Sequence, residues 1–228
     1  MADAVKWEGP PVSGEAAKRP EKITLEGAYV TITRLDPARH GDALWKSAGG
    51  PENAELWRYM HSGPFESRES FDMYLTAKAA SEDPLFFTVI DRATGQPGGH
   101  ATYLRIDPGQ RVMEVGSIVY VRAFQRTRAA TEAMYLMAKH AFEDLGYRRY
   151  EWKCHSLNEA SQRAAQRLGF SFEGVFRQHM IVKGRNRDTA WFAMLDYEWP
   201  ARRKEFERWL APDNFDEQGR QKTRLRHK

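Results

Sequence analysis

The sequence contains a single cysteine among 228 residues. Cys154 alone can form no disulfide within the chain and no cysteine-cluster metal site. The seven histidines are scattered without a His-x-x-x-His pair, so we expect no metal. Long apolar runs are also missing. Leu85–Ile90, among the longest, is far below the ~20 residues that span a bilayer, so we expect no membrane segment.

The chain also lacks a secretory leader and a strong charge of one sign. Met1–Lys22 is polar and rich in proline and glycine, so we expect a cytoplasmic protein. The 35 basic and 31 acidic residues leave a net charge of +4, too small an excess to indicate nucleic acid binding without a clustered patch. Hydrophobic residues make up 41% and aromatic residues 12%, which is enough for a core and excludes general disorder.

Length and composition predict one domain with an extension at each end. Residues 1–22 have the composition of an N-terminal arm, in which Trp7 is an apolar anchor. Residues 23–199 form the predicted domain, and residues 200–228 a helix with a basic tail from Arg220. Such a tail is most often solvated, and contact with RNA is the alternative. Three aromatic residues of this extension would cover either the chain's own sheet or a twin subunit in a homodimer: Phe206, Trp209 and Phe215.

Strand and helix signals alternate between these ends. Polar–apolar alternation and β-branched runs predict strands at Tyr29–Leu35, Leu85–Ile90, His100–Ile106, Val112–Val121, Arg149–Cys154, Phe170–Val182 and Thr189–Trp199. Helical spacing predicts helices at Ser67–Ala80, Ala129–Leu145, Asn158–Leu168 and Ala201–Leu210. The fold class is therefore α+β: a mixed sheet of about seven strands flanked by helices, antiparallel first, with one crossover unit in its second half.

The most informative segment is Val115–Thr131, where a β-rich run enters a polar loop that opens directly into an alanine-rich helix. The start of a helix presents unpaired backbone N–H groups and the positive end of its dipole, which suit a phosphate. Arg126 and Arg128 add charge, and the hydroxyls of Thr127 and Thr131 add donors. Taken alone, the loop fits equally well an ordinary threonine cap with solvated arginines.

Further motifs follow along the chain: Glu114-Val-Gly116, Gln125, Thr131-Glu-Ala133, Asn158-x-x-Ser161 and Arg167-Leu-Gly-Phe170. In this order they resemble the Gcn5-related N-acetyltransferases (GNAT), most closely the RimJ/RimL branch. The resemblance covers roughly Ile23 to Trp199. One residue departs from it. Where the family's loop reads Gln/Arg-x-x-Gly-x-Gly/Ala, Arg128 stands at the first glycine position, which bears on how closely the backbone approaches a pyrophosphate.

The resemblance implies acetyl-CoA as co-substrate, with its pantetheine arm between a bulged strand and the neighbouring strand. Backbone amides of the loop would hold the pyrophosphate. Asn158 would bind the pantetheine amide, and capping of a helix is its alternative role. Arg167 would bind the phosphate end of the coenzyme, and a solvated charge is its alternative role. The implied cofactor-binding residues are Ile118, Val119, Tyr120, Val121, Gln125, Arg126, Thr127, Arg128, Ala129, Ala130, Thr131, Asn158 and Arg167.

The implied mechanism is direct attack of a substrate amine on the thioester within a ternary complex. Glu114 is the candidate base, directly or through water, and a salt-bridged glutamate is the equally weighted alternative. Ser161, one helical turn beyond Asn158, is the candidate to protonate or steady the leaving thiolate, with packing or capping as its rival role. Cys154 is expected to be buried and inert rather than an acyl relay.

Acceptor recognition is expected within Trp45–Phe65, because the RimJ/RimL branch places its acceptor-binding loops in the corresponding first helices. Arg58, Tyr59 and His61 are the candidates to contact an aromatic or nucleotide-like group. The turn Lys183–Arg187 is a further candidate wall. The expected function is transfer of an acetyl group to a primary amine of a small molecule, a peptide N-terminus or an aminoacyl conjugate. The alternative is a non-catalytic acyl-CoA sensor or interaction module.

Overall fold

The computed structural model describes residues 9–12 and 14–227, and capping side chains mark where several helices begin. Asp36, Ser67, Thr127 and Asn158 each accept a hydrogen bond from a backbone N–H in the first turn of the helix that follows. Such caps satisfy amides that a helix start leaves unpaired. The helices are α1 (Pro37–Ala48), η1 (Pro51–Trp57), α2 (Arg68–Ala80), α3 (Arg128–Lys139), η2 (His140–Asp144), α4 (Glu159–Arg167), α5 (Trp199–Leu210) and η3 (Pro212–Asn214).

The strands form one mixed sheet of 8 strands in the order β1-β2-β3-β4-β5-β6-β8-β7. They are β1 (Leu25–Glu26), β2 (Val30–Arg34), β3 (Leu85–Asp91), β4 (Pro97–Asp107), β5 (Val112–Tyr120), β6 (Arg149–His155), β7 (Ser171–Val182) and β8 (Arg185–Leu195). Neighbours are antiparallel except for the parallel pair β5 and β6, which α3 connects. The α+β prediction is confirmed. The additional strand, β1, has 2 residues, too few to form a recognisable pattern.

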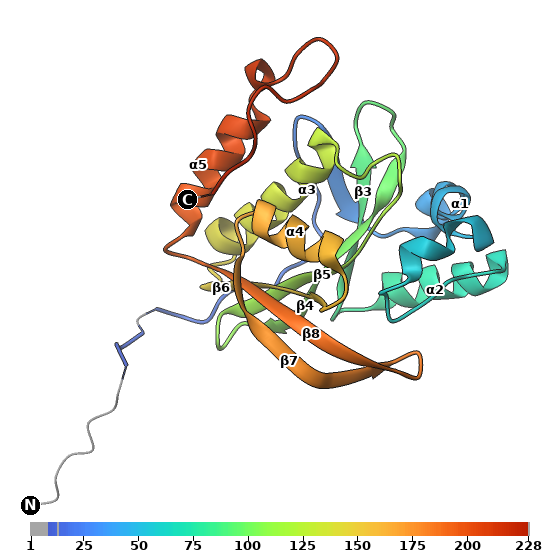
Figure 1. Ribbon diagram of the computed structural model, residues 1–228, viewed down its shortest axis with the longest axis horizontal. Coiled ribbons are helices and arrows are strands. Elements are labelled where there is room, and N and C mark those ends of the chain that lie inside the picture. The colour runs from blue at the N-terminus through green and yellow to red at the C-terminus, as the bar shows by residue number, and fades with distance from the viewer. Residues whose placement is uncertain (1–8, 13, 228) are drawn as a thin grey trace, which may run out of the picture.

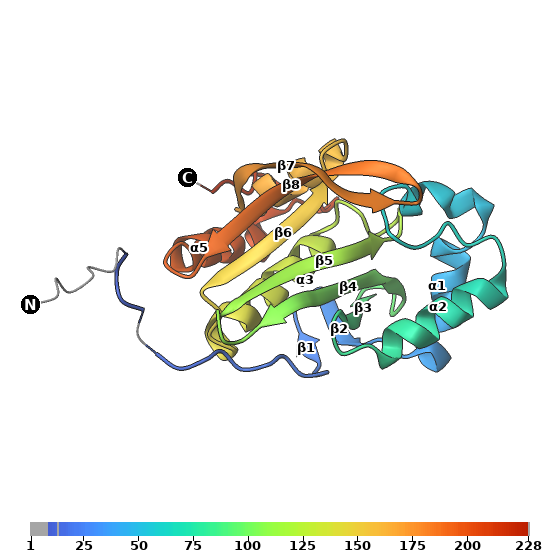
Figure 2. The same ribbon diagram turned by 90° about the horizontal axis from the view of Figure 1, so that it is seen from below.

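The helices lie on one face of the sheet and at one of its ends (Figures 1 and 2). α3 lies against that face with α4 and α5 beside it, whereas α1 and α2 lie at the end toward which β5 points. The packing of α3 depends on small or flexible side chains with no exposed area, such as Ala133 and Met137. Within the described part of the chain, no helix has the length and apolar character needed to cross a membrane.

Beyond their first residues, β5 and β6 separate. They pair only from Val112–Glu114 to Arg149–Glu151, although β5 continues to Tyr120 and β6 to His155. In the same stretch of β5, the register with β4 shifts and Ser117 has a φ of 45°, the signature of a bulge. The two strands therefore leave a gap in the middle of the sheet, which the view from below shows (Figure 2).

Glu132 of α3 anchors the turn that leads into β2. Its carboxylate accepts hydrogen bonds from the backbone N–H groups of Ala28 at 2.9 Å, Tyr29 at 2.6 Å and Val30 at 2.9 Å. Gly27 is required beside it, because a Cβ at this position would overlap the carboxylate. The glutamate of the Thr131-Glu-Ala133 motif therefore joins the helix to the edge of the sheet.

α5 covers α3 of the same chain. The rings of Trp199 and Phe206 lie 6.1 and 5.5 Å from that of Tyr135. Trp209 and Phe215 are also buried, and their rings meet edge to face at 5.1 Å. The aromatic residues of this extension were predicted to cover either the chain's own sheet or a twin subunit. In the structure they pack on elements of their own chain.

The basic C-terminal tail folds back on α5. The backbone N–H of Thr223 donates to Asn214 Oδ1 at 2.9 Å, and Leu225 is buried. Arg208 of α5 donates to the carbonyl of Arg224 at 3.0 Å. The tail therefore packs through Leu225, whereas Arg220, Lys222, Arg224 and Arg226 are exposed, as a solvated basic run requires.

The predicted N-terminal arm is attached to the domain before its expected end. Ala17 is buried, and its N–H donates to the carbonyl of Pro108 at 3.0 Å. The N–H of Lys18 donates to the carbonyl of Leu145 at 2.9 Å. Packing therefore begins near Ala17 rather than at Ile23. Trp7, the predicted anchor, lies outside the described residues.

Two predicted boundaries near the C-terminus differ in the structure. β8 begins at Arg185, so the connection between β7 and β8 is only Lys183–Gly184 instead of the predicted turn Lys183–Arg187. Trp199 was predicted to end a strand, but it opens α5, with a proline in the helix's first turn. Proline fits this position because the first turn leaves its backbone donors unpaired.

Candidate active site

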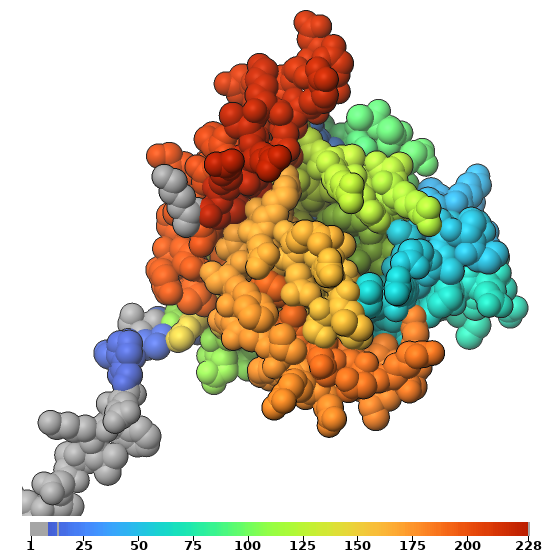
Figure 3. Space-filling model, viewed as in Figure 1, coloured from blue at the N-terminus to red at the C-terminus, as the bar shows by residue number. Residues whose placement is uncertain are grey.

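A cavity of about 1070 Å³ lies between the start of α3, α4 and the C-terminal segment. Figure 3 shows the surface hollowed between the gold α4 and the yellow-green segment that begins α3. Among the predicted residues, those lining it are Ile118, Tyr120, Gln125, Arg126, Thr127, Arg128, Ala130, Thr131, Asn158, Ser161 and Arg167. Val119, Val121 and Ala129 are buried instead, and their side chains belong to the core.

The loop before α3 keeps unpaired amides at this cavity. The N–H groups of Arg126, Arg128 and Ala129 reach no acceptor among the described residues. The other amides of the predicted row donate within the loop, as that of Ala130 does to Thr127 Oγ1 at 3.0 Å. Fewer backbone amides of the loop are therefore unpaired than the sequence predicted. Unpaired N–H groups at the positive end of a helix form an anion site.

Backbone geometry and one side chain fix the shape of this loop. Arg126 has a φ of 63°, a left-handed conformation that a non-glycine residue adopts at a cost of about 1–2 kcal/mol. Gln125 Nε2 donates to the carbonyl of Tyr120 at 2.8 Å and thereby ties the loop to the end of β5. Strained backbone of this kind concentrates at ligand-binding positions, where the surrounding structure holds it in place.

Arg128, the departure from the family pattern, lies between two aromatic rings. Its guanidinium carbon is 3.3 Å from the ring centroid of Phe215 and 4.5 Å from that of Tyr29. Arg128 is the first residue of α3, so its backbone is helical and a side chain is tolerated without strain. The substitution therefore keeps the amide and adds a cation held by aromatic faces.

The C-terminal segment supplies a wall of the cavity that sequence reasoning missed. Its lining residues are Trp209, Phe215, Gly219, Arg220 and Gln221. Arg167 joins this wall to α3, because its guanidinium carbon lies 4.8 Å from the Trp209 ring and its Nη1 donates to Thr131 Oγ1 at 3.1 Å. Arginine and aromatic residues were visible in the sequence, but no local pattern tells which surface such a segment covers.

At the opposite wall, α4 presents amide and hydroxyl groups. Asn158 Oδ1 accepts the N–H of Ser161 at 3.1 Å, so the predicted cap exists, and its NH₂ has no partner among the described residues. Ser161 Oγ accepts the indole N–H of Trp152 at 3.0 Å. The Tyr120 hydroxyl is buried without a partner in the described chain, and burial raises its pKa, so it remains a proton donor.

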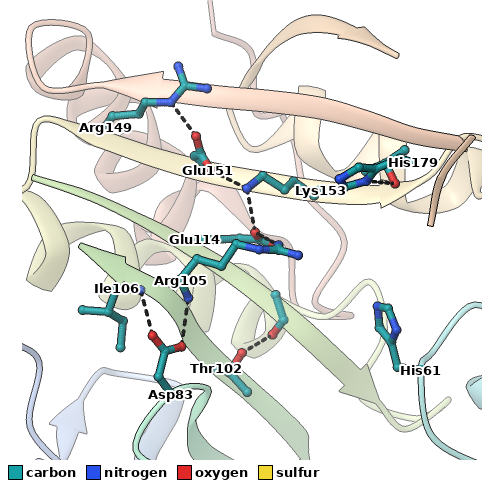
Figure 4. A network of polar contacts seen from close by, with 12 residues as sticks. His61, Asp83, Thr102, Arg105, Ile106, Glu114, Arg149, Glu151, Lys153 and His179 are labelled. Atoms are coloured by element: carbon teal, nitrogen blue, oxygen red, sulfur yellow. Dashed lines mark hydrogen bonds and ion pairs between the residues drawn. The ribbon is translucent and has the colours of Figure 1, made fainter. Parts of the chain in front are cut away.

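Glu114 belongs to a chain of ion pairs that crosses the sheet (Figure 4). Its Oε2 lies 2.6 Å from Arg105 Nη1 and 3.1 Å from Lys153 Nζ. Lys153 also pairs with Glu151 at 2.6 Å, which pairs with Arg149 at 2.6 Å. Burial raises the pKa of Glu114, and the two cations lower it, with a net rise. The ion-paired alternative for this glutamate is therefore present in the structure.

One oxygen of Glu114 remains available. Both cations contact Oε2, and Oε1 has no hydrogen-bond partner among the described residues. Oε1 lies beside Gly116, where a Cβ would come within 3.0 Å of it. Glu114 and Gly116 occupy the part of β5 where pairing with β6 ends. A carboxylate oxygen at the gap can accept a proton directly or through water.

The predicted acceptor residues lie on the segment that follows η1 and contact two other parts of the chain. Tyr59 Oη donates to the carbonyl of Leu157 at 3.1 Å. His61 Nε2 lies 2.9 Å from Arg187 Nη1. Arg58 is exposed, pairs with Glu55 at 3.1 Å and does not reach the sheet. Of the three, His61 is therefore the one joined to a residue of the sheet.

Neither the cysteine nor the histidines form a further reactive centre. Burial raises the pKa of the Cys154 thiol, while a hydrogen bond from Ser161 lowers it, with a net rise. The thiolate, which is the nucleophilic form, is thereby disfavoured. Among the described residues, no group of three or more His, Cys, Asp or Glu side chains is placed to hold a metal ion.

A sheet that opens between two parallel strands, beside a helix start with free amides, defines an acyl-coenzyme A transferase fold. Comparison with known proteins agrees. The family described as "Acetyltransferase (GNAT) domain" matches residues 33–171. The chain therefore belongs to the GNAT acetyltransferases, as the motif order predicts, and acetyl-CoA is the acetyl donor of this family.

Solved structures and a curated relative are similar over different lengths. A GCN5-related N-acetyltransferase from Brucella melitensis is 46% identical, with a TM-score of 0.91 over 93% of this chain and 96% of that one. A probable GNAT acetyltransferase from Chromobacterium violaceum is 38% identical, with a TM-score of 0.79 over 88% and 100%. The putative ribosomal N-acetyltransferase YdaF from Bacillus subtilis is 29% identical over 94 residues, 41% of this chain. The match spans about half (51%) of that relative's length.

Proposed function

We propose that this chain transfers the acetyl group of acetyl-CoA to a primary amine by direct attack in a ternary complex. The observation that carries the proposal is the set of unpaired amides of Arg126, Arg128 and Ala129 at a cavity that also includes Ile118 and Tyr120 of the bulged strand. A diphosphate at these amides and a thioester near the gap between β5 and β6 fit one extended ligand.

The residues present suit the parts of that ligand. The free amides and the arginines of the cavity bind phosphates, and the Asn158 NH₂ donates to a pantetheine carbonyl. Acetyl-CoA supplies an activated thioester. The backbone N–H groups of the bulged strand polarise its carbonyl, as donors fixed by the fold.

Three side chains act on the protons and the leaving group. Glu114 Oε1, the oxygen that Arg105 and Lys153 do not hold, accepts the proton that the substrate ammonium loses, directly or through water, and the neutral amine then attacks. Ser161 turns its hydroxyl hydrogen from the Cys154 thiol toward the leaving thiolate, and Tyr120, whose hydroxyl has no partner among the described residues, is a second donor beside the same cavity. The cytoplasmic location and a homodimer stay predictions.

The experiment is an amine screen with the purified chain and acetyl-CoA, covering amino acids, peptides and aminoacyl conjugates. We expect amine-dependent release of the coenzyme thiol and a product heavier by one acetyl group. The ion pairs that hold Glu114 favour one alternative, a module that binds acyl-CoA without turning it over. Calorimetry that detects coenzyme binding, together with no amine-dependent thiol release across the screen, would support that alternative and refute the proposed reaction.

A further inference from the structure

Arg187 of β8 is a buried cation that pairs with no carboxylate in the part of the chain that the structure describes. The residue is 8% exposed, and its Nη1 contacts His61 Nε2 at 2.9 Å. Its Nε is buried and reaches no acceptor among the described residues. A guanidinium stays protonated in a folded protein, and a buried charge without a counter-ion is strongly unfavourable. The residue therefore has the properties of a binding position for an anion from outside the chain.

The charges around Arg187 already neutralise one another. The chain of ion pairs contains Arg105, Lys153 and Arg149 against three glutamates, Glu114, Glu151 and Glu173, and Arg187 stands outside it. The adjacent Asp188 accepts hydrogen bonds from the Gln178 N–H at 2.7 Å and from Asn186 Nδ2 at 2.9 Å. Successive residues of a strand point to opposite faces, so Asp188 does not face the Arg187 guanidinium.

His61 offers no negative charge to Arg187 and accepts one of its N–H groups. An arginine N–H that donates to Nε2 requires the neutral imidazole, which then carries its hydrogen on Nδ1. Burial, followed by the charges of Arg187, Arg105 and Lys183, lowers the pKa of His61 and keeps the ring neutral. His61 thereby orients the guanidinium through Nη1 and leaves its other N–H groups for an anion.

Arg187 lies on the Glu114 side of the sheet. Arg187 and Trp191 point to the same face of β8, because they are four residues apart in a strand. On that face Lys153, which pairs with Glu114, lies 3.8 Å from the Trp191 ring centroid. Arg187 does not line the coenzyme cavity. A group bound at Arg187 is therefore separated from the coenzyme phosphates by the sheet.

The tip of the β7–β8 hairpin is held in place against η1. Lys183 Nζ donates to the carbonyl of Trp57 at 2.8 Å, next to the contact between Arg187 and His61. The Arg187 guanidinium is thus held by contacts between segments far apart in the chain. A fixed guanidinium binds a planar or tetrahedral anion with less loss of conformational freedom than mobile surface lysines do.

We propose that the acceptor amine carries a second, anionic group, a carboxylate or a phosphate, which binds the Arg187 guanidinium, oriented by His61, while the amine lies toward Glu114. The inference rests on the proposed acetyl transfer and specifies its substrate class. It distinguishes this chain from an enzyme for neutral polyamines or simple aliphatic amines, for which a buried cation beside the acceptor would be repulsive.

The first test compares matched amines in the acetylation assay. Phenylalanine is compared with phenylalanine amide, and phosphoethanolamine with ethanolamine. The kcat/KM values are expressed per unprotonated amine, because the members of each pair differ in amine pKa. We expect the anionic member of at least one pair to be favoured by about tenfold or more, the size expected for a charge-assisted pair. The pair that shows the preference identifies the anion as carboxylate or phosphate.

Three variants assign this preference to Arg187. In Arg187→Gln the preference falls to near unity, and in Arg187→Lys, which keeps the charge but not the fork, it is intermediate. Arg185→Gln, a change of an exposed arginine on the same strand, keeps the full preference. Coenzyme binding by calorimetry confirms that each variant is folded. Equal kcat/KM for anionic and neutral amines, or a preference that survives in Arg187→Gln, would overturn the inference.

A second test does not depend on turnover. Inorganic phosphate and acetate are titrated into the chain saturated with coenzyme A, and their binding is followed by NMR line broadening. We expect broadening of at least one anion that is lost in Arg187→Gln and kept in Arg185→Gln. If no amine is acetylated but this pattern holds, the anion site stands and the proposed reaction fails. If amines are acetylated but the broadening is identical in both variants, the anion site fails and the reaction stands.

Discussion

At the scale of single residues, the two carboxylate oxygens of Glu114 have different surroundings. Oε2 is held by Arg105 and Lys153, and Oε1 lies beside Gly116 where the strands part. Burial is the first cause that raises the pKa of Glu114 above its ordinary value of 4.5, and the two cations oppose it. A carboxyl group in this position loses its function as a proton acceptor at a higher pH than an exposed one.

We therefore expect Glu114→Gln to lower kcat/KM by about 100-fold, the lower range for loss of a general base. The parent's kcat/KM rises with pH as Glu114 ionises, and this acid limb is lost in the variant, while the limb from the acceptor amine remains. The measurement is kcat/KM against pH with one acceptor. Glu151→Gln, in the same chain of ion pairs, serves as the matched control and should keep the acid limb. An unchanged limb in Glu114→Gln would exclude Glu114 as the base.

At the scale of elements, the contact between α3 and the start of β2 depends on one carboxylate. Glu132 is buried and accepts from Ala28, Tyr29 and Val30. We expect Glu132→Gln to lower the free energy of unfolding by about 1.5–3 kcal/mol, the range for hydrogen bonds to a charged group. Urea denaturation measures this as a lower midpoint at constant m. Glu159→Gln, at an exposed pair with Arg163, should change it by less than about 0.5 kcal/mol. Equal effects would contradict the anchoring role.

The joint between α3 and the C-terminal segment is a second element-scale contact. Arg128 lies 3.3 Å from the Phe215 ring centroid, and both residues line the coenzyme cavity. We expect Arg128→Ala and Phe215→Ala each to weaken coenzyme binding, and the double variant to be weakened by less than the sum. The expected coupling is about 0.5–2 kcal/mol, the range of a cation–π pair. Calorimetric titration of the four proteins measures it, and strict additivity would mean that the pair acts independently.

The elements with strong local signals were predictable from the sequence. Three features around the loop before α3 are local in sequence: the β-rich run, the cap at Thr127 and the alanine-rich helix. This loop was therefore predictable from a short stretch of the chain. The hairpin β7–β8 was harder. Arg185 and Arg187 resemble turn residues in sequence, but they are two positions apart in β8 and share one of its faces.

The parts of the site that sequence reasoning missed depend on contacts between distant segments. Nothing near Phe215 or Trp209 in the sequence indicates that these two residues line the cavity, in contact with Arg128 and Arg167. The partnership of His61 with Arg187 joins residues 126 positions apart. Glu114 was predicted to reach the cleft or to be ion-paired, and the structure contains the ion pairs because Arg105 and Lys153 arrive from adjacent strands.

At the scale of the whole molecule, the coenzyme cavity joins three regions that are separate in the chain: the start of α3, α4 and the C-terminal segment. A ligand that contacts all three binds the folded chain and not the unfolded one. Coenzyme A at 100 times its Kd should therefore add about 2.7 kcal/mol to the free energy of unfolding. For a chain of this size the increase corresponds to a rise in Tm of roughly 5–10 °C.

Thermal denaturation with and without coenzyme A measures this shift. Pantetheine, which lacks the phosphates, is the matched ligand and should give a much smaller rise at equal concentration. A rise with coenzyme A that is no larger than with pantetheine would contradict a phosphate site at the start of α3.

The separation of the two sides of the sheet affects how such a protein can diversify. The cavity proposed for the coenzyme is formed by α3, α4 and the C-terminal segment, whereas His61 and Arg187 meet on the other side, near the tip of the β7–β8 hairpin. Replacements at that hairpin and at the segment after η1 change no residue that lines this cavity. Libraries confined to these two short segments should therefore retarget the enzyme to new amines while donor affinity stays constant, which makes them a practical starting point for engineered acylation.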